Sequence, residues 1–153
     1  MSAINGTSLT LYIPSHAADA TGVTITWIPI GLSKSASLSI SADTPDISTK
    51  DSSGWSEVIA GMKSWSMDFE SLLDLTDDAS ANGLLPLWTY FSTRAKIKVA
   101  WGKAGVYWYG DAYLSSLDES AESEQPVSFS GSLTGSGALT LGTSGTEPPT
   151  YES

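Results

Sequence analysis

Serine alternates with apolar residues along three separate stretches of this chain, and this two-residue period most restricts its fold. Residues 35–41, 64–71 and 127–134 each place an apolar residue or a glycine at every second position. Side chains of an extended strand point alternately to opposite faces, so the period predicts strands with one apolar and one hydroxyl-bearing face. The chain is therefore predicted to be mainly β, and its serine-lined faces are its most informative feature.

The rest of the chain predicts further strands and one helix. Strands are expected at residues 8–14, 23–30, 96–101, 106–117 and 138–141. Apolar residues at positions 84, 87, 88 and 91 have the spacing of one helical face instead. We expect a short helix over residues 83–93, with Pro86 in its first turn and a cap from Asp77, Asp78 or Ser80.

The composition excludes several kinds of chemistry. The chain has 153 residues, which suits a single domain, with no cysteine and one histidine, His16. Disulfides, thiolate zinc sites and multi-histidine metal sites are thereby ruled out.

Seventeen acidic against seven basic residues leave a net charge of −10. A negative net charge disfavours nucleic-acid binding, because binding to phosphates requires lysine and arginine. We expect no cofactor, no metal ion and no membrane span.

Catalysis is not favoured by the residues present. His16 lies in a predicted loop, and no glycine-flanked nucleophile elbow appears in the sequence. A glycosidase needs two carboxylates facing each other across a cleft, and nothing in the sequence indicates such a cleft. A small hydrolase would depend on His16 or on one of the acidic pairs, which are Asp43 with Asp46, Asp77 with Asp78, and Asp68 with Glu70.

A tyrosine stripe follows one face of the predicted strand 106–117. Tyr107, Tyr109 and Tyr113 alternate there with smaller residues. We rank a subunit interface first, because tyrosine is enriched at interfaces, burial in the core second, and a sugar-stacking platform third. The platform keeps a carbohydrate-binding β-sandwich, or an adhesin domain, as the alternative function.

The polar stretch 42–61 is longer than most loops of compact domains, and such loops are usually functional or disordered. With its flanks, this stretch resembles the major tail proteins of long-tailed bacteriophages, the tail tube family. The matching elements follow one another over residues 36–141. They are the run 46–51, Gly54-Trp55 and Gly61, the strand 109–114 with its Gly-x-Ala-Tyr motif, and the strand 127–137, which ends in Gly-x-Gly.

The resemblance implies a β-sandwich or partial barrel with one short flanking helix, in a single domain over residues 1–153. It implies hexameric rings whose inner sheets join into a continuous β-barrel, stacked into a tube through which DNA passes without specific binding. The loop 42–61 would reach the adjacent ring, and arms at 1–7 and 142–153 would add contacts. The partners implied are other copies and the tape measure, terminator and baseplate proteins.

The resemblance also implies a structural protein rather than an enzyme, located in the virion after assembly in the host cytoplasm. A hydroxyl-rich, acidic wall suits DNA passage, because a basic wall would bind phosphate. The residues expected to line the lumen are Ser35, Ser37, Ser39, Ser41, Ser64, Ser66, Asp68 and Glu70. The face of Ser128, Ser130 and Ser132 is left undecided between channel wall and outer surface. Inter-subunit contacts are expected from Asp43, Asp46, Lys50, Asp51, Trp55, Tyr107, Tyr109 and Tyr113.

Overall fold

The structure is a computed structural model that describes residues 10–14, 27–30, 32–51, 53–73, 84–103 and 105–142. Its strands are β1 (Thr10–Pro14), β2 (Trp27–Pro29), β3 (Leu32–Ala42), β4 (Lys63–Leu72), β5 (Ile97–Lys103), β6 (Val106–Ser120), β7 (Ser128–Gly135) and β8 (Thr140–Gly142). The single helix among these residues, α1, covers Leu84–Thr93. The expected helix over residues 83–93 is therefore confirmed to within one residue.

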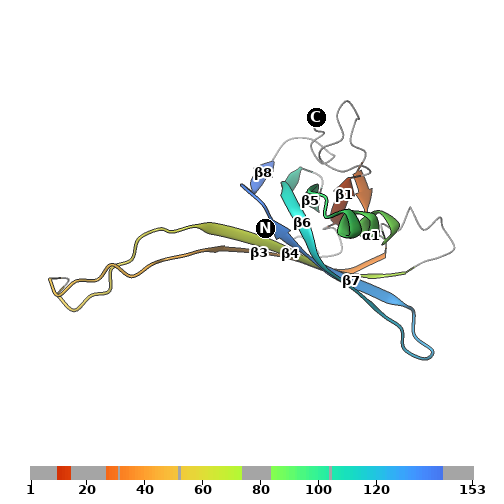
Figure 1. Cartoon of the computed structure of the whole chain (residues 1–153), viewed down its shortest axis with the longest axis horizontal. Helices are drawn as coiled ribbons and strands as arrows, with labels where there is room; N and C mark the ends of the chain where they lie inside the picture. The colour runs from red at the N-terminus through yellow and green to blue at the C-terminus, as the bar shows by residue number, and fades with distance from the viewer. Residues whose placement is uncertain are drawn as a thin grey trace, which may run out of the picture.

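The strands form one antiparallel sheet that does not close on itself. Its order is β2-β1-β5-β6-β7-β4-β3, and β8 pairs with the start of β6. The Ile30 amide donates a hydrogen bond to the Leu11 carbonyl at 3.0 Å, which extends the pairing of β1 with β2 by one residue. Strand β3 also contacts β1, so the two ends of the sheet approach each other. Helix α1 lies against the body on the β6 side, and the β3–β4 hairpin extends far out from it (Figure 1). The predicted mainly β fold with one flanking helix is confirmed.

The core lies between the folded halves of the sheet and under α1. Its buried side chains come from β1, β4, β5, β6, β7 and the inner side of the helix, which contributes Leu87 and Tyr90. The Tyr90 hydroxyl donates a hydrogen bond to the Pro14 carbonyl at 2.6 Å, which ties α1 to the end of β1. Burial raises the pKa of Tyr90 to about 12. The helix is thus fixed by an apolar face and by one buried polar anchor.

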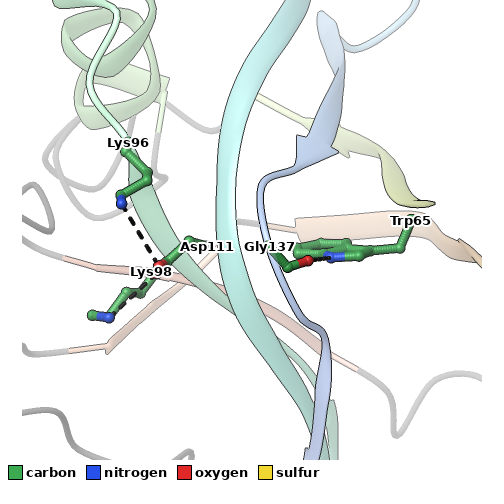
Figure 2. A network of polar contacts seen from close by, with 5 residues as sticks. All are labelled: Trp65, Lys96, Lys98, Asp111 and Gly137. Atoms are coloured by element: carbon green, nitrogen blue, oxygen red, sulfur yellow. Dashed lines mark hydrogen bonds and ion pairs between the residues drawn. The ribbon is translucent and has the colours of Figure 1, made fainter. Parts of the chain in front are cut away.

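Trp65 packs flat over glycines in the centre of the sheet. A Cβ on Gly135 would lie 2.2 Å from the Trp65 ring, and one on Gly110 would lie 2.8 Å from it. The indole Nε1 donates a hydrogen bond to the Gly137 carbonyl at 3.1 Å (Figure 2). These glycines therefore make room for a large ring where any side chain would collide with it.

Replacing Gly135 with alanine is expected to destabilise the fold by about 1–3 kcal/mol, because the new methyl group overpacks against Trp65. Chemical denaturation of the purified variant measures this loss. The control is Thr134→Ala, one residue earlier and exposed on the opposite face, which should change stability by less than about 0.5 kcal/mol. Equal stability of the two variants would show that the ring moves aside freely.

Two segments differ from their sequence-based predictions. The stretch 42–61, predicted to be a loop, continues the β3–β4 hairpin: its arms stay paired through an isolated bridge between Asp46 and Val58. The strand expected over residues 106–117 continues to Ser120, as β6. The proposed helix caps and the arm at 1–7 lie outside the described residues. Of the arm expected at 142–153, only Gly142 is described, as the last residue of β8.

Candidate functional site: the hydroxyl face and the hairpin arm

One face of the sheet is covered by hydroxyl and carboxylate groups. We call this side of β3, β4, β7 and the second half of β6 the hydroxyl face. The strands place their apolar residues, such as Met67, Phe69 and Leu133, in the core on the other side. The hydroxyl face carries Ser35, Ser37, Ser39, Ser41, Ser64, Ser66, Asp68, Glu70, Ser116, Asp118, Ser130, Ser132 and Thr134.

The strand register aligns these side chains in rows that cross all four strands. One row joins Ser37, Asp68, Ser132 and Ser116, the next joins Ser35, Glu70, Ser130 and Asp118, and a third joins Ser39, Ser66, Thr134 and Tyr113. The eight residues predicted to line a lumen therefore lie on one surface, on β3 and β4. The undecided face of β7 joins this same surface, between β4 and β6.

Hydrogen bonds connect neighbouring strands across the face. The Ser41 and Ser64 hydroxyls lie 2.9 Å apart, and either one is the donor. The Ser132 hydroxyl donates to the Asp68 carboxylate. A shallow depression lies at the centre of the face, lined by side chains of the first two rows, including Ser37, Asp68 and Ser116. The surface is thus polar, open and crossed by hydroxyl contacts.

The hydroxyl face is net negative, because Asp68, Glu70 and Asp118 lie there with Lys34. Its cations, in addition, lie beside carboxylates. Lys34 pairs with Glu70 at 3.1 Å. Where the same face continues onto β5, the Lys98 ammonium lies 3.2 Å from Asp111 and that of Lys96 lies 3.9 Å from it (Figure 2). A phosphate would have to compete with a carboxylate at each of these lysines.

Sequence reasoning missed the contribution of β6 to this face. A β-bulge between Leu114 and Ser116 shifts the strand register, so the residues that face the polar side change from odd to even numbers. Ser116 and Asp118 thereby join the hydroxyl face, although simple alternation placed Ser115 there. No residue in the printed sequence marks this bulge, since serines stand at both 115 and 116.

The tyrosine stripe does not form one surface. Tyr107 is 4% exposed and packs edge-to-face against Tyr12, with 6.1 Å between ring centroids. The expectation of an interface is therefore wrong for Tyr107, whose ring lies in the core of this chain. Tyr113 is 44% exposed beside the hydroxyl face. Because the three tyrosine rings do not share one exposed surface, they do not form the platform that a sugar-stacking site would use.

The hairpin arm, which we define as residues 43–62, is held together by its backbone. The Gly61 amide donates to the Asp43 carbonyl at 2.7 Å, and the Ile47 amide donates to the Glu57 carbonyl at 2.9 Å. Hydrogen bonds from the Ser48 side chain and from the Ser48 amide, the latter at 2.7 Å, lower the pKa of Asp46. The arm is an ordered two-stranded extension rather than an irregular loop.

The side chains of the hairpin arm are exposed, including large apolar ones. Trp55 is 80% exposed and Met62 is 81% exposed. Ile47, Val58 and Ile59 are about half exposed. The arm also carries the other predicted contact residues, Asp43, Asp46, Lys50 and Asp51, all of them exposed. Several large exposed apolar side chains on one protruding element are typical of a binding surface.

A family model described as phage tail tube protein matches residues 3–141. The chain therefore belongs to the phage tail tube family. The family is structural, and the chain is accordingly a structural protein of the phage tail rather than an enzyme. Within the described residues, no helix is long and apolar enough to cross a membrane. A search of curated proteins found no match.

Solved structures agree with this fold. The tail of an empty gene transfer agent particle, determined with C6 symmetry, matches with a TM-score of 0.72 and 18% identity, over 91% of this chain and 98% of that one. The SPP1 tail tube matches with a TM-score of 0.71 and 16% identity, over 93% and 80%. A chain of the six-fold symmetrised anti-feeding prophage baseplate matches with a TM-score of 0.65 and 9% identity, over 92% and 95%.

Proposed function

We propose that this chain forms hexameric rings that stack into a tail tube, with the hydroxyl face lining a channel for DNA. The observation that carries the proposal is the continuity of this face across β3, β4, β7 and β6. Such rows of hydroxyls and carboxylates on one side of a sheet, with a packed core on the other, suit a wall that contacts water and DNA.

The two outer strands of the hydroxyl face have edges to which a neighbour can add. Among the described strands, none pairs with the outer edge of β3 or with residues 113–120 of β6 on the side opposite β7. Since β3 and β6 run antiparallel to each other, the β6 edge of one copy can pair with the β3 edge of the next. Repeated around a ring, this pairing covers both of these edges and closes a barrel.

The ring size is supported by the symmetry of similar assemblies. The gene transfer agent tail has C6 symmetry, and the baseplate with a similar chain is six-fold symmetrised. Six copies, each with four strands, would give a barrel wide enough for an aqueous channel, since diameter grows with strand number. The partners expected from the resemblance to the tail tube family are other tail proteins: the terminator and the baseplate at the tube ends, and a tape measure protein inside.

The chemistry of the face suits the passage of DNA. Binding of DNA releases counterions when lysine or arginine neutralises phosphates, and this binding would slow a moving duplex. On the hydroxyl face, Lys34 is paired with Glu70, while Asp68 and Asp118 add negative charge. The wall therefore offers water-like hydroxyl contacts and weak repulsion.

Electron microscopy of the purified protein tests the proposal directly. We expect rings or tubes whose end-on views have six-fold symmetry. A protein that stays monomeric at high concentration and binds glycans would contradict the proposal and favour the carbohydrate-binding alternative.

A further inference from the structure

Two apolar surfaces of the described chain have no cover within it, and they lie on different parts of the molecule. One is the hairpin arm, with Trp55 and Met62. The other is the outer side of α1, where Leu85 is 54% exposed, Trp88 is 56% exposed and Phe91 is 39% exposed. Their separation and their chemistry point to contact between copies.

The outer side of α1 forms a preorganised aromatic stripe. The rings of Trp88 and Phe91 stack with 6.2 Å between their centroids and 30° between their planes. On the inner side, Leu87 and Tyr90 are buried and fix the rotation of the helix. The exposed stripe is therefore held rigidly, so that covering it would cost little ordering entropy.

A basic residue continues this stripe beyond the helix. Arg94 directly follows α1 and is exposed. In the described part of the chain, no carboxylate forms an ion pair with Arg94. Arg94 also adopts a positive φ of 56°, a conformation that glycine or asparagine usually provides at a helix end. We call Leu85, Trp88, Phe91 and Arg94 the helix patch.

The hairpin arm has the complementary chemistry. It combines exposed apolar side chains with Asp43, Asp46, Asp51 and Glu57, against a single Lys50. An acidic, apolar arm and a basic, aromatic patch match both in charge and in hydrophobicity. Charge complementarity of this kind selects the partner and its orientation.

We propose that the hairpin arm of one copy docks on the helix patch of a second copy, with Trp55 against the Trp88–Phe91 stack. This inference rests on the proposed function and names the surface that receives the arm. The arm extends away from the body that carries α1 (Figure 1), so it does not reach the patch of its own chain. Contact between two different surfaces is heterologous, and it propagates from copy to copy as a tube requires.

Disulfide trapping between single-cysteine variants tests the docking. The chain has no cysteine, so any disulfide reports only the introduced pair. Trp55→Cys protein is mixed with Trp88→Cys or Phe91→Cys protein, allowed to assemble and then oxidised. We expect covalent dimers from at least one mixture at about tenfold the yield of the control, Trp55→Cys with Ser120→Cys, which places the second thiol at the end of β6.

The outcomes separate the docking from the proposed function. Tubes that form while both mixtures crosslink no better than the control would overturn the docking and leave the tail tube function standing. Unmodified protein that forms no rings or tubes would overturn the function and the docking together.

A charge variant tests the basic end of the patch. Arg94→Glu should raise the protein concentration needed for assembly about tenfold, whereas Arg94→Lys should leave it nearly unchanged. Circular dichroism verifies that both variants fold. Normal assembly of a folded Arg94→Glu protein would remove Arg94 from the contact and contradict the proposed charge pairing.

Discussion

A phage whose tube subunit carries Asp68→Lys and Glu70→Lys is expected to form normal tails and to lose at least about tenfold in infectivity. Both residues lie on the hydroxyl face, outside the core, so folding and ring formation should survive the change. The reversal adds lysines next to Lys34 and removes the carboxylate that pairs with it. Each subunit would then present a cluster of unpaired cations to passing phosphates.

Plaque titres and the rate of DNA ejection in vitro measure this effect. The matched control is Asp68→Asn with Glu70→Gln, which removes the negative charges but adds no cation, and it should lose much less. Asparagine at 68 also keeps an acceptor for the Ser132 hydroxyl. Unchanged infectivity of the lysine variant, with normal tails, would show that these residues do not line the channel.

Shortening the hairpin arm is expected to abolish tubes while leaving the subunit folded. Residues 47–57 are replaced by Asn-Gly, which forms a two-residue turn between the paired residues Asp46 and Val58. The core contains no side chain of the removed segment, so the melting temperature should stay within a few degrees of the original. The variant loses the exposed Trp55 and, with it, the main apolar surface of the arm.

Sedimentation and electron microscopy follow the loss of assembly. Trp55→Ala alone serves as the graded control and should weaken assembly without abolishing it, as large exposed aromatics carry much of the energy of an interface. A shortened protein that forms tubes as readily as the original would show that the arm has no part in assembly.

The faces of β3, β4 and β7 could be predicted from sequence because alternation is unbroken there. Each strand alternates there between a polar residue, mostly serine, and an apolar residue or glycine, and burial of one side then fixes the register of its partner. Helix α1 was also predictable, because its apolar spacing has a different period. These predictions needed only the local sequence.

The remaining features depend on contacts that local sequence does not record. The bulge at Leu114–Ser116 is set by how β6 pairs with β7, and it reassigned Ser116 to the hydroxyl face. The alternation around Tyr107 predicted a surface residue, but Tyr12, which is distant in sequence, packs against its ring. The hairpin arm contains proline and glycine and so suggested a loop, yet its pairing uses backbone groups that almost any sequence supplies.

Among the described strands none covers the outer edge of β3, and such an edge can pair with other chains. The strand carries a partial safeguard against this pairing. A second bulge lies between Ser33 and Ser35, and its extra residue is Lys34. A bulge and a lysine are the devices by which natural edge strands resist unwanted pairing. They block one end of the edge and leave residues 37–42 free. In the proposed ring this edge is covered by β6 of the next copy, so the bulge and the lysine would act on the free subunit, before the ring closes.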